Sequence, residues 1–261
     1  MLRSYAQGDD FILGTANAPG QASAVNLNTT NTTCIGNVAT TVIPVEATTS
    51  PRGIVALQGK PWVVAVDPAD TDGRMQVRAK TPTREWMVGS GDEPAETRRA
   101  IADTAQCLKC HVGSLYQHGG NRVDNVDMCI ICHNSASSEQ NVRVDMGVDA
   151  SEAYDGKVGQ TFEFKTMLHM LHSSGEEGRK PLVIYRTRGI YAWASDVSLL
   201  PNWGMTAPCE KANPTSGQEY LVYGADPTLD VSCQPFTLYS PTYPRLFNDC
   251  EACHVAGFNQ V

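Results

Sequence analysis

Short alternating runs of apolar and polar residues dominate the first third of the chain. Three runs rich in β-forming residues are separated by turn residues: GIVALQ from Gly53, PWVVAV from Pro61 and RMQVRAK from Arg74. The preceding segment 26–50 is rich in Thr, Asn and Val and has no helical period. This pattern predicts a small antiparallel β domain over residues 1–91, with an irregular N-terminal lead.

Helical periodicity begins after residue 92. The stretch GDEPAETRRAIADTAQCLKC predicts a helix, with Asp92 as a candidate N-cap and Pro94 in its first turn. Segment 201–245, in contrast, carries several Pro and Gly residues and little period. Residues 92–261 are therefore expected to form a loop-rich, partly helical second domain, which needs a further source of order.

A second helix is predicted over residues 161–174, TFEFKTMLHMLHSS. Four apolar residues at i, i+3, i+4 and i+7 form one stripe: Phe164, Met167, Leu168 and Leu171. His169 and His172 are three residues apart, so they project from one side of the helix, one turn above the other. Both histidines are therefore candidate ligands.

Composition narrows the classes of protein that the chain can represent. The hydrophobic fraction of 41% and the charged fraction of 18% are typical of a globular protein. The net charge is −8 and no basic patch is present, so a nucleic-acid partner is not expected. No apolar run approaches the roughly 18 residues of a membrane helix. The N-terminus also lacks the apolar region of a secretory signal.

The pattern Cys-x-x-Cys-His occurs three times and is the chemical signature of the sequence. It is the attachment pattern of c-type haem, in which two thiols bond one porphyrin and the adjacent imidazole binds the iron. We therefore expect three haem c groups held by six thiols: Cys107, Cys110, Cys129, Cys132, Cys250 and Cys253. The proximal iron ligands would then be His111, His133 and His254.

Two other interpretations account for only part of this pattern. The first four cysteines fit a four-cysteine zinc site, C-x2-C-x18-C-x2-C. Thiol redox chemistry needs only a single Cys-x-x-Cys pair. Neither alternative explains why a histidine follows each pair directly, or why a third pair is present.

The histidine count agrees with three six-coordinate irons. The chain has six histidines, and three remain after the proximal ligands: His118, His169 and His172. Three haems with two axial positions need six ligands, which predicts bis-histidine ligation throughout, with these three as distal ligands. The rival axial ligands Met128, Met167 and Met170 are expected to serve in the core instead.

Closed ligation favours electron transfer over catalysis at the iron, because no coordination position is left for a substrate. His169 and His172 would serve different irons, because neighbours on one helical face cannot bind opposite faces of one haem. The leading hypothesis is thus an electron relay that acts by outer-sphere transfer. The alternatives are a haem enzyme with one open iron, such as a small-oxyanion reductase, and a subunit of a conductive cytochrome filament.

Three stretches carry a family resemblance: RRAIADTAQCLKCHVGSLYQHGGNRVDNVDMCIICHN, FKTMLHMLHSSGEEGRKPLVIY and CEACHVAG. In this order they resemble the OmcA/MtrC family of outer-membrane multihaem c-type cytochromes. The resemblance implies distal ligands at the positions of His118, His169 and His172, and a β domain paired with a haem domain. Members of that family typically carry more haems, so a short relative, a fragment or an assembly with copies of itself is expected.

The resemblance also implies a place and partners. It implies extracellular or cell-surface electron transfer, with minerals, flavins or partner cytochromes as acceptors, and an electron carrier or outer-sphere terminal reductase rather than an ordinary enzyme. Haem c is matured outside the cytoplasm, so an extracytoplasmic location is expected, at the outer membrane or beyond it rather than in the periplasm.

Three cysteines lie outside the attachment motifs: Cys34, Cys209 and Cys233. In an oxidising compartment, Cys209 and Cys233 are the expected disulfide because they bracket part of the Pro- and Gly-rich loop. Cys34 would then remain a free thiol or bond outside the chain.

Overall fold

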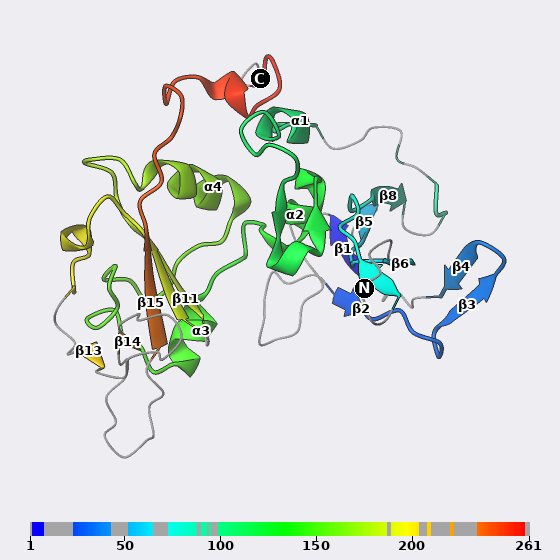
Figure 1. The fold of residues 1–261 in the computed structure, drawn as a ribbon, viewed down its shortest axis with the longest axis horizontal. Helices are drawn as coiled ribbons and strands as arrows, with labels where there is room; N and C mark the ends of the chain where they lie inside the picture. The colour runs from blue at the N-terminus through cyan, green and yellow to red at the C-terminus, as the bar shows by residue number, and fades with distance from the viewer. Residues whose placement is uncertain are drawn as a thin grey trace. The chain divides into compact units, whose positions relative to one another are not determined.

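The structure is a computed structural model with mixed β-sheets and few helices (Figure 1). It describes residues 2–7, 23–42, 52–64, 73–87, 90–92, 94, 99–186, 189–203, 208–209, 220–221 and 234–258. The chain divides into two compact units, one of Met1–Asn134 with Asp249–Val261 and one of Ser135–Asn248. The first unit combines the strands of residues 1–91 with all three attachment motifs. The domain boundary expected at residue 92 stays a prediction.

An antiparallel four-stranded sheet forms the β part of the first unit. Its order is β2 (Ser23–Val25), β1 (Leu2–Gln7), β5 (Arg52–Leu57) and β8 (Thr83–Met87). These strands agree with a small β domain over residues 1–91. The lead predicted to be irregular nevertheless contains β1, which pairs with β5 over six residues. Backbone pairing with distant β5 fixes this strand, and local residue preference does not reveal it.

Two separate hairpins complete the β strands of this part. They are β3 (Thr32–Ile35) with β4 (Val38–Thr41), and β6 (Trp62–Val64) with β7 (Arg74–Gln76). The predicted runs at Gly53, Pro61 and Arg74 thus correspond to β5, β6 and β7. Cys34 lies in β3 as an exposed free thiol.

One small core joins β5 to helix α2 (Val126–Cys132). Ile54 and Ala56 of the strand pack with Met128 and Ile131 of the helix. Met128 is only 1% exposed, which agrees with its expected role in the core. The helix that carries the second attachment motif is therefore seated on the β sheet.

The second unit is built on a five-stranded sheet. Its order is β11 (Leu182–Arg186), β12 (Gly189–Trp193), β15 (Gln234–Tyr239), β14 (Tyr220–Leu221) and β13 (Pro208–Cys209). Three of these strands lie in segment 201–245, which the sequence predicted to be mainly loop. β12 and β15 pair in parallel, so this pairing depends on residues more than 40 positions apart, such as Ile190 and Phe236. Cys233 and the side chain of Cys209 lie outside the described residues, so their disulfide stays a prediction.

Helix α4 (Phe164–Ser173) packs on this sheet and confirms the helix expected at 161–174. Met167, Met170 and Leu171 pack against a core of Phe162, Leu182 and Ile184. The two methionines therefore have the core role expected of them. Among the helices that the structure describes, none has the length and apolar character needed to cross a bilayer.

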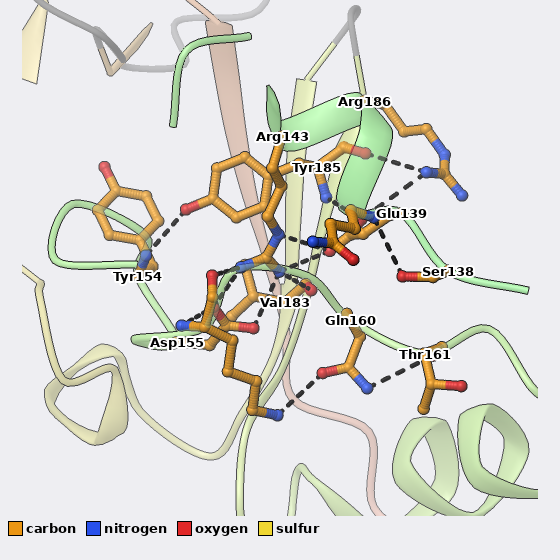
Figure 2. Close-up of polar contacts among 12 residues, drawn as sticks. Ser138, Glu139, Arg143, Tyr154, Asp155, Gln160, Thr161, Val183, Tyr185 and Arg186 are labelled. Atoms are coloured by element: carbon orange, nitrogen blue, oxygen red, sulfur yellow. Dashed lines mark hydrogen bonds and ion pairs between the residues drawn. The ribbon is translucent and has the colours of Figure 1, made fainter. Parts of the chain in front are cut away.

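A buried ion network connects α3 (Gln140–Asp145) to β11 in the second unit (Figure 2). The fully buried guanidinium of Arg143 donates to both carboxylate oxygens of Asp155, at 2.6 and 2.9 Å, and to Oε1 of Glu139 at 2.9 Å. The amide of Tyr185 donates to Oε2 of Glu139 at 2.8 Å, and the Tyr185 ring lies against Arg143, 4.4 Å from centroid to guanidinium carbon. One cation thus holds two carboxylates in the interior.

This network gives a pH prediction for Glu139→Gln. Burial raises the pKa of the Glu139 carboxyl from 4.5 to about 7, although Arg143, the Tyr185 amide and Arg186 oppose the rise. A carboxyl whose pKa is higher in the folded state contributes stability below pH 4.5 and loses it as the pH rises through about 7. In the wild type, the opening free energies of the β11 amides, measured by hydrogen exchange, should therefore fall as the pH rises from 4.5 to about 7. The slope should be absent in Glu139→Gln and retained in the exposed control Glu177→Gln. Equal slopes in all three proteins would contradict the assignment.

Candidate haem-binding site

The three attachment motifs share one backbone turn. In each motif the amide of the histidine donates to the carbonyl of the first cysteine: His111 to Cys107 at 2.9 Å, His133 to Cys129 at 2.9 Å and His254 to Cys250 at 3.0 Å. This i to i−4 bond places the two cysteines about one helical turn apart, with the imidazole directly after them. The same local fold is therefore formed three times.

Helix α1 (Thr104–Cys107) delivers the first motif but is much shorter than predicted. Its N-cap is Asp103 and not Asp92, because described residues 99–103 are not helical. The backbone there pairs with the third motif: the Asp103 amide donates to the Cys253 carbonyl at 3.0 Å, and Val255 donates to Ile101 at 3.1 Å. This pairing takes the backbone groups that a longer helix would have used.

The second motif lies at the end of α2, whose N-cap is Asn125. Asn125 stands four residues before Cys129, as Asp103 stands four residues before Cys107. Both side chains cap their helices, accepting from Ala105 at 2.8 Å and from Asp127 at 3.0 Å. Neither cap was predicted from the sequence, although a residue type that commonly caps helices stands four positions before the first cysteine in both motifs.

All three motifs lie in the first unit, and thiols of different motifs affect one another's pKa. Burial raises the pKa of the Cys107 thiol, and the nearby Cys253 thiol raises it further. Burial also raises the pKa of Cys129 to about 11, with smaller contributions from Cys132 and Cys107. The chain just before Cys107 contacts both other motif-bearing segments: Thr104 Oγ1 accepts from the Val126 amide at 3.1 Å, and the Asp103 amide donates to the Cys253 carbonyl at 3.0 Å. Within the described ranges, no three His, Cys, Asp or Glu side chains gather as a metal-ligand group.

His118 lies at the tip of a hairpin formed by β9 (Tyr116–Gln117) and β10 (Arg122–Val123). The turn begins with three left-handed residues, at φ +54° for His118, +74° for Gly119 and +81° for Gly120. The His118 and His133 rings have centroids 6.1 Å apart and planes inclined by 32°. The structure thus brings one expected distal ligand to one expected proximal ligand.

This separation can be compared with the span of a bis-imidazole iron. With metal–nitrogen bonds of about 2 Å and ring nitrogens about 1.2 Å from the ring centre, two imidazoles that hold one metal from opposite sides would have centroids about 6.4 Å apart. The 6.1 Å between the centroids of His118 and His133 is close to this span. His118 thus approaches His133, the histidine of the second motif.

Two further histidines are oriented by backbone carbonyls. Nδ1 of His172 lies 2.8 Å from the Leu168 carbonyl oxygen, and Nδ1 of His254 lies 3.1 Å from that of Ile101. Because a carbonyl oxygen only accepts, Nδ1 is the donor in both contacts, and Nε2 is the nitrogen that faces away from the carbonyl. This is the usual arrangement around a metal-binding imidazole. His169 and His172 both lie on α4 in the second unit.

Three Cys-x-x-Cys-His turns of the same local fold are the signature of a c-type cytochrome of the multihaem class. The family model described as outer membrane cytochrome MtrC/MtrF-like, domains II/IV, matches residues 99–261. The chain belongs to this family of outer-membrane multihaem cytochromes, which confirms the resemblance noted in the sequence. Its cofactor is haem c, and proteins of this family are electron carriers. No curated protein matches the chain.

Proposed function

We propose that the chain relays electrons through three closely spaced bis-histidine haems by outer-sphere transfer, at the cell surface or outside the cell. The observation that carries this proposal is the His118–His133 pair, 6.1 Å apart in the unit that holds all three attachment motifs. Because one expected distal histidine lies near one expected proximal histidine, we extend bis-histidine ligation to the other two irons.

The residues have three roles in this proposal. The thiols of the three motifs attach the haems: Cys107, Cys110, Cys129, Cys132, Cys250 and Cys253. The proximal ligands are His111, His133 and His254, and the distal ligands are His118, His169 and His172. When bound, haem c supplies an iron that gains and loses one electron.

The chain itself orients the ligands and limits water. The carbonyls of Leu168 and Ile101 accept from Nδ1 of His172 and His254 and orient the two rings, so Nε2 is the nitrogen that would bind the metal. Met128 and Ile131, at 1% and 0% exposure, pack with Ile54 and Ala56 of β5 and exclude water from that side of α2. With both axial positions filled by imidazole, electrons pass without a bond between iron and acceptor.

The proposed partners follow from outer-sphere transfer and from the family. Other multihaem cytochromes or further copies of this chain would donate or accept electrons, and metals or flavins would be terminal acceptors. Because the donor and acceptor need only approach a haem, the same relay serves in a cytochrome chain and in a terminal reductase.

Spectroscopy of the ferric protein tests the ligation. We expect only low-spin signals, because two imidazoles at each iron give a strong ligand field and no open position. A high-spin fraction that binds nitrite or cyanide would contradict closed ligation and support the enzyme alternative instead.

A further inference from the structure

We propose that Thr81 and Thr83 of the β part position both axial histidines of the haem attached at Cys129 and Cys132. The inference rests on the proposed function, in which His118 and His133 are the ligands of that iron. The short segment 81–83 of the β part would then help to orient both iron ligands. It is hydrogen-bonded to the β9–β10 hairpin, which carries His118, and to the Asn125 cap of α2, which ends directly before His133.

The first connection leads from Thr81 to His118. Thr81 Oγ1 accepts from the Val123 amide at 3.1 Å, and the Thr81 amide donates to the Val123 carbonyl at 3.0 Å. Val123 belongs to β10 and pairs with Tyr116 of β9, two residues before His118. Thr81 and Val123 are 2% and 4% exposed, so these bonds are shielded from water. The base of the His118 hairpin is thus fixed to Thr81.

The second connection leads from the same segment to His133. The side-chain amide of Asn125 donates to the Thr81 carbonyl at 2.7 Å and to Thr83 Oγ1 at 3.1 Å. Its oxygen simultaneously accepts from the Asp127 amide and caps α2. Since α2 ends at Cys132, directly before His133, this cap fixes the start of the helix that presents the proximal ligand.

The geometry of the His118 turn requires such support. A non-glycine residue at φ +54° is strained, and strained turns persist only where the surroundings hold them. A two-stranded hairpin is also marginally stable by itself in water. The β part supplies further bonds, from Arg122 Nε to Gln58 Oε1 at 2.7 Å and from the Gly59 amide to the Asn121 carbonyl at 3.3 Å. The hairpin that carries His118 is therefore held by residues outside the haem motifs.

Two variants separate the two connections. Thr81→Val keeps the shape of the side chain but removes the acceptor for the Val123 amide, whereas Thr81→Ser retains the hydroxyl. Asn125→Asp keeps the oxygen that caps α2 but removes both donations to the β part. The matched control is Thr41→Val, because the Thr41 hydroxyl bonds Thr32 at 2.7 Å in the outlying β3–β4 hairpin.

The readout is electron paramagnetic resonance with potentiometry on the fully loaded protein. Thr81→Val and Asn125→Asp should each shift the highest g value and the potential of the same single haem, because these report the orientation of the two imidazoles. Thr81→Ser should restore the wild-type signal, and Thr41→Val should leave all signals unchanged. Unchanged g values and potentials in both Thr81→Val and Asn125→Asp would overturn the positioning role.

His118→Met distinguishes this failure from a failure of the proposed ligation. If His118 is an axial ligand, this variant changes the ligation of the same haem that Thr81→Val affects. If all signals remain those of the wild type, His118 is no ligand and the proposed function is wrong at this iron. If His118→Met alters one haem and Thr81→Val alters another, the ligation stands and the positioning proposal falls.

Discussion

Replacing Arg143 by Met is expected to lower the opening free energy of the second unit by about 3–5 kcal/mol. Arg143 is the only cation that is fully buried among the described residues, and its guanidinium bonds both Glu139 and Asp155 in the interior. Methionine has a similar length but bonds neither acid, so buried Asp155 loses its guanidinium partner and Glu139 keeps the longer contact with Arg186, at 3.8 Å. The loss should appear as faster hydrogen exchange of the β11 and β12 amides, including that of Tyr185, which donates to Glu139.

Lys165→Met is the matched control, because it removes a cation from the exposed pair with Glu163. The Lys165 side chain is 71% exposed and its nitrogen lies 3.6 Å from the carboxylate. Such a surface pair contributes about 0–1 kcal/mol, so exchange in β11 should hardly change. Equal effects of the two variants would show that burial of the Arg143 network does not determine the stability of this unit.

Replacing His172 by Met is expected to raise the reduction potential of one haem strongly, on the order of 0.1 V or more, because thioether ligation favours ferrous iron. Only one haem should respond, and the reason is geometric. His169 and His172 leave α4 one turn apart and on one side, so each must serve its own iron. Potentiometry followed by optical spectroscopy should resolve the shifted centre.

His169→Met completes this test. It should shift a different haem and leave the His172 centre low-spin with its potential only modestly changed. If both variants altered the same single haem, α4 would not separate two irons, and the assignment of distal ligands would have to be revised.

The local features of the chain could be predicted from its sequence. The three motifs are defined by adjacent residues, and α4 by an apolar stripe that repeats within ten residues. The runs at Gly53, Pro61 and Arg74 likewise indicated β5, β6 and β7 through composition and turns. In each case the interactions that form the element lie within a few positions of it.

Features that depend on distant residues could not be predicted in the same way. The start of α1 is set by backbone bonds from Ile101 and Asp103 to the third motif, about 150 positions later. β1 becomes a strand through pairing with β5, about 50 positions later. The approach of His118 to His133 depends on the β9–β10 hairpin, which is short and has no apolar alternation. Tertiary contacts therefore decide how the correctly predicted pieces meet.

Three haems bound covalently at the three motifs would stay on the chain when the protein unfolds, so the mass of the unfolded protein counts them. The protein should be unfolded in acid with a reductant and a chelator, and its intact mass then measured. Thioether bonds survive this treatment, whereas a thiolate metal site empties. We expect a single species with the mass of the chain plus three haems. Recovery of a haem-free chain with six reactive thiols in the motifs would contradict it.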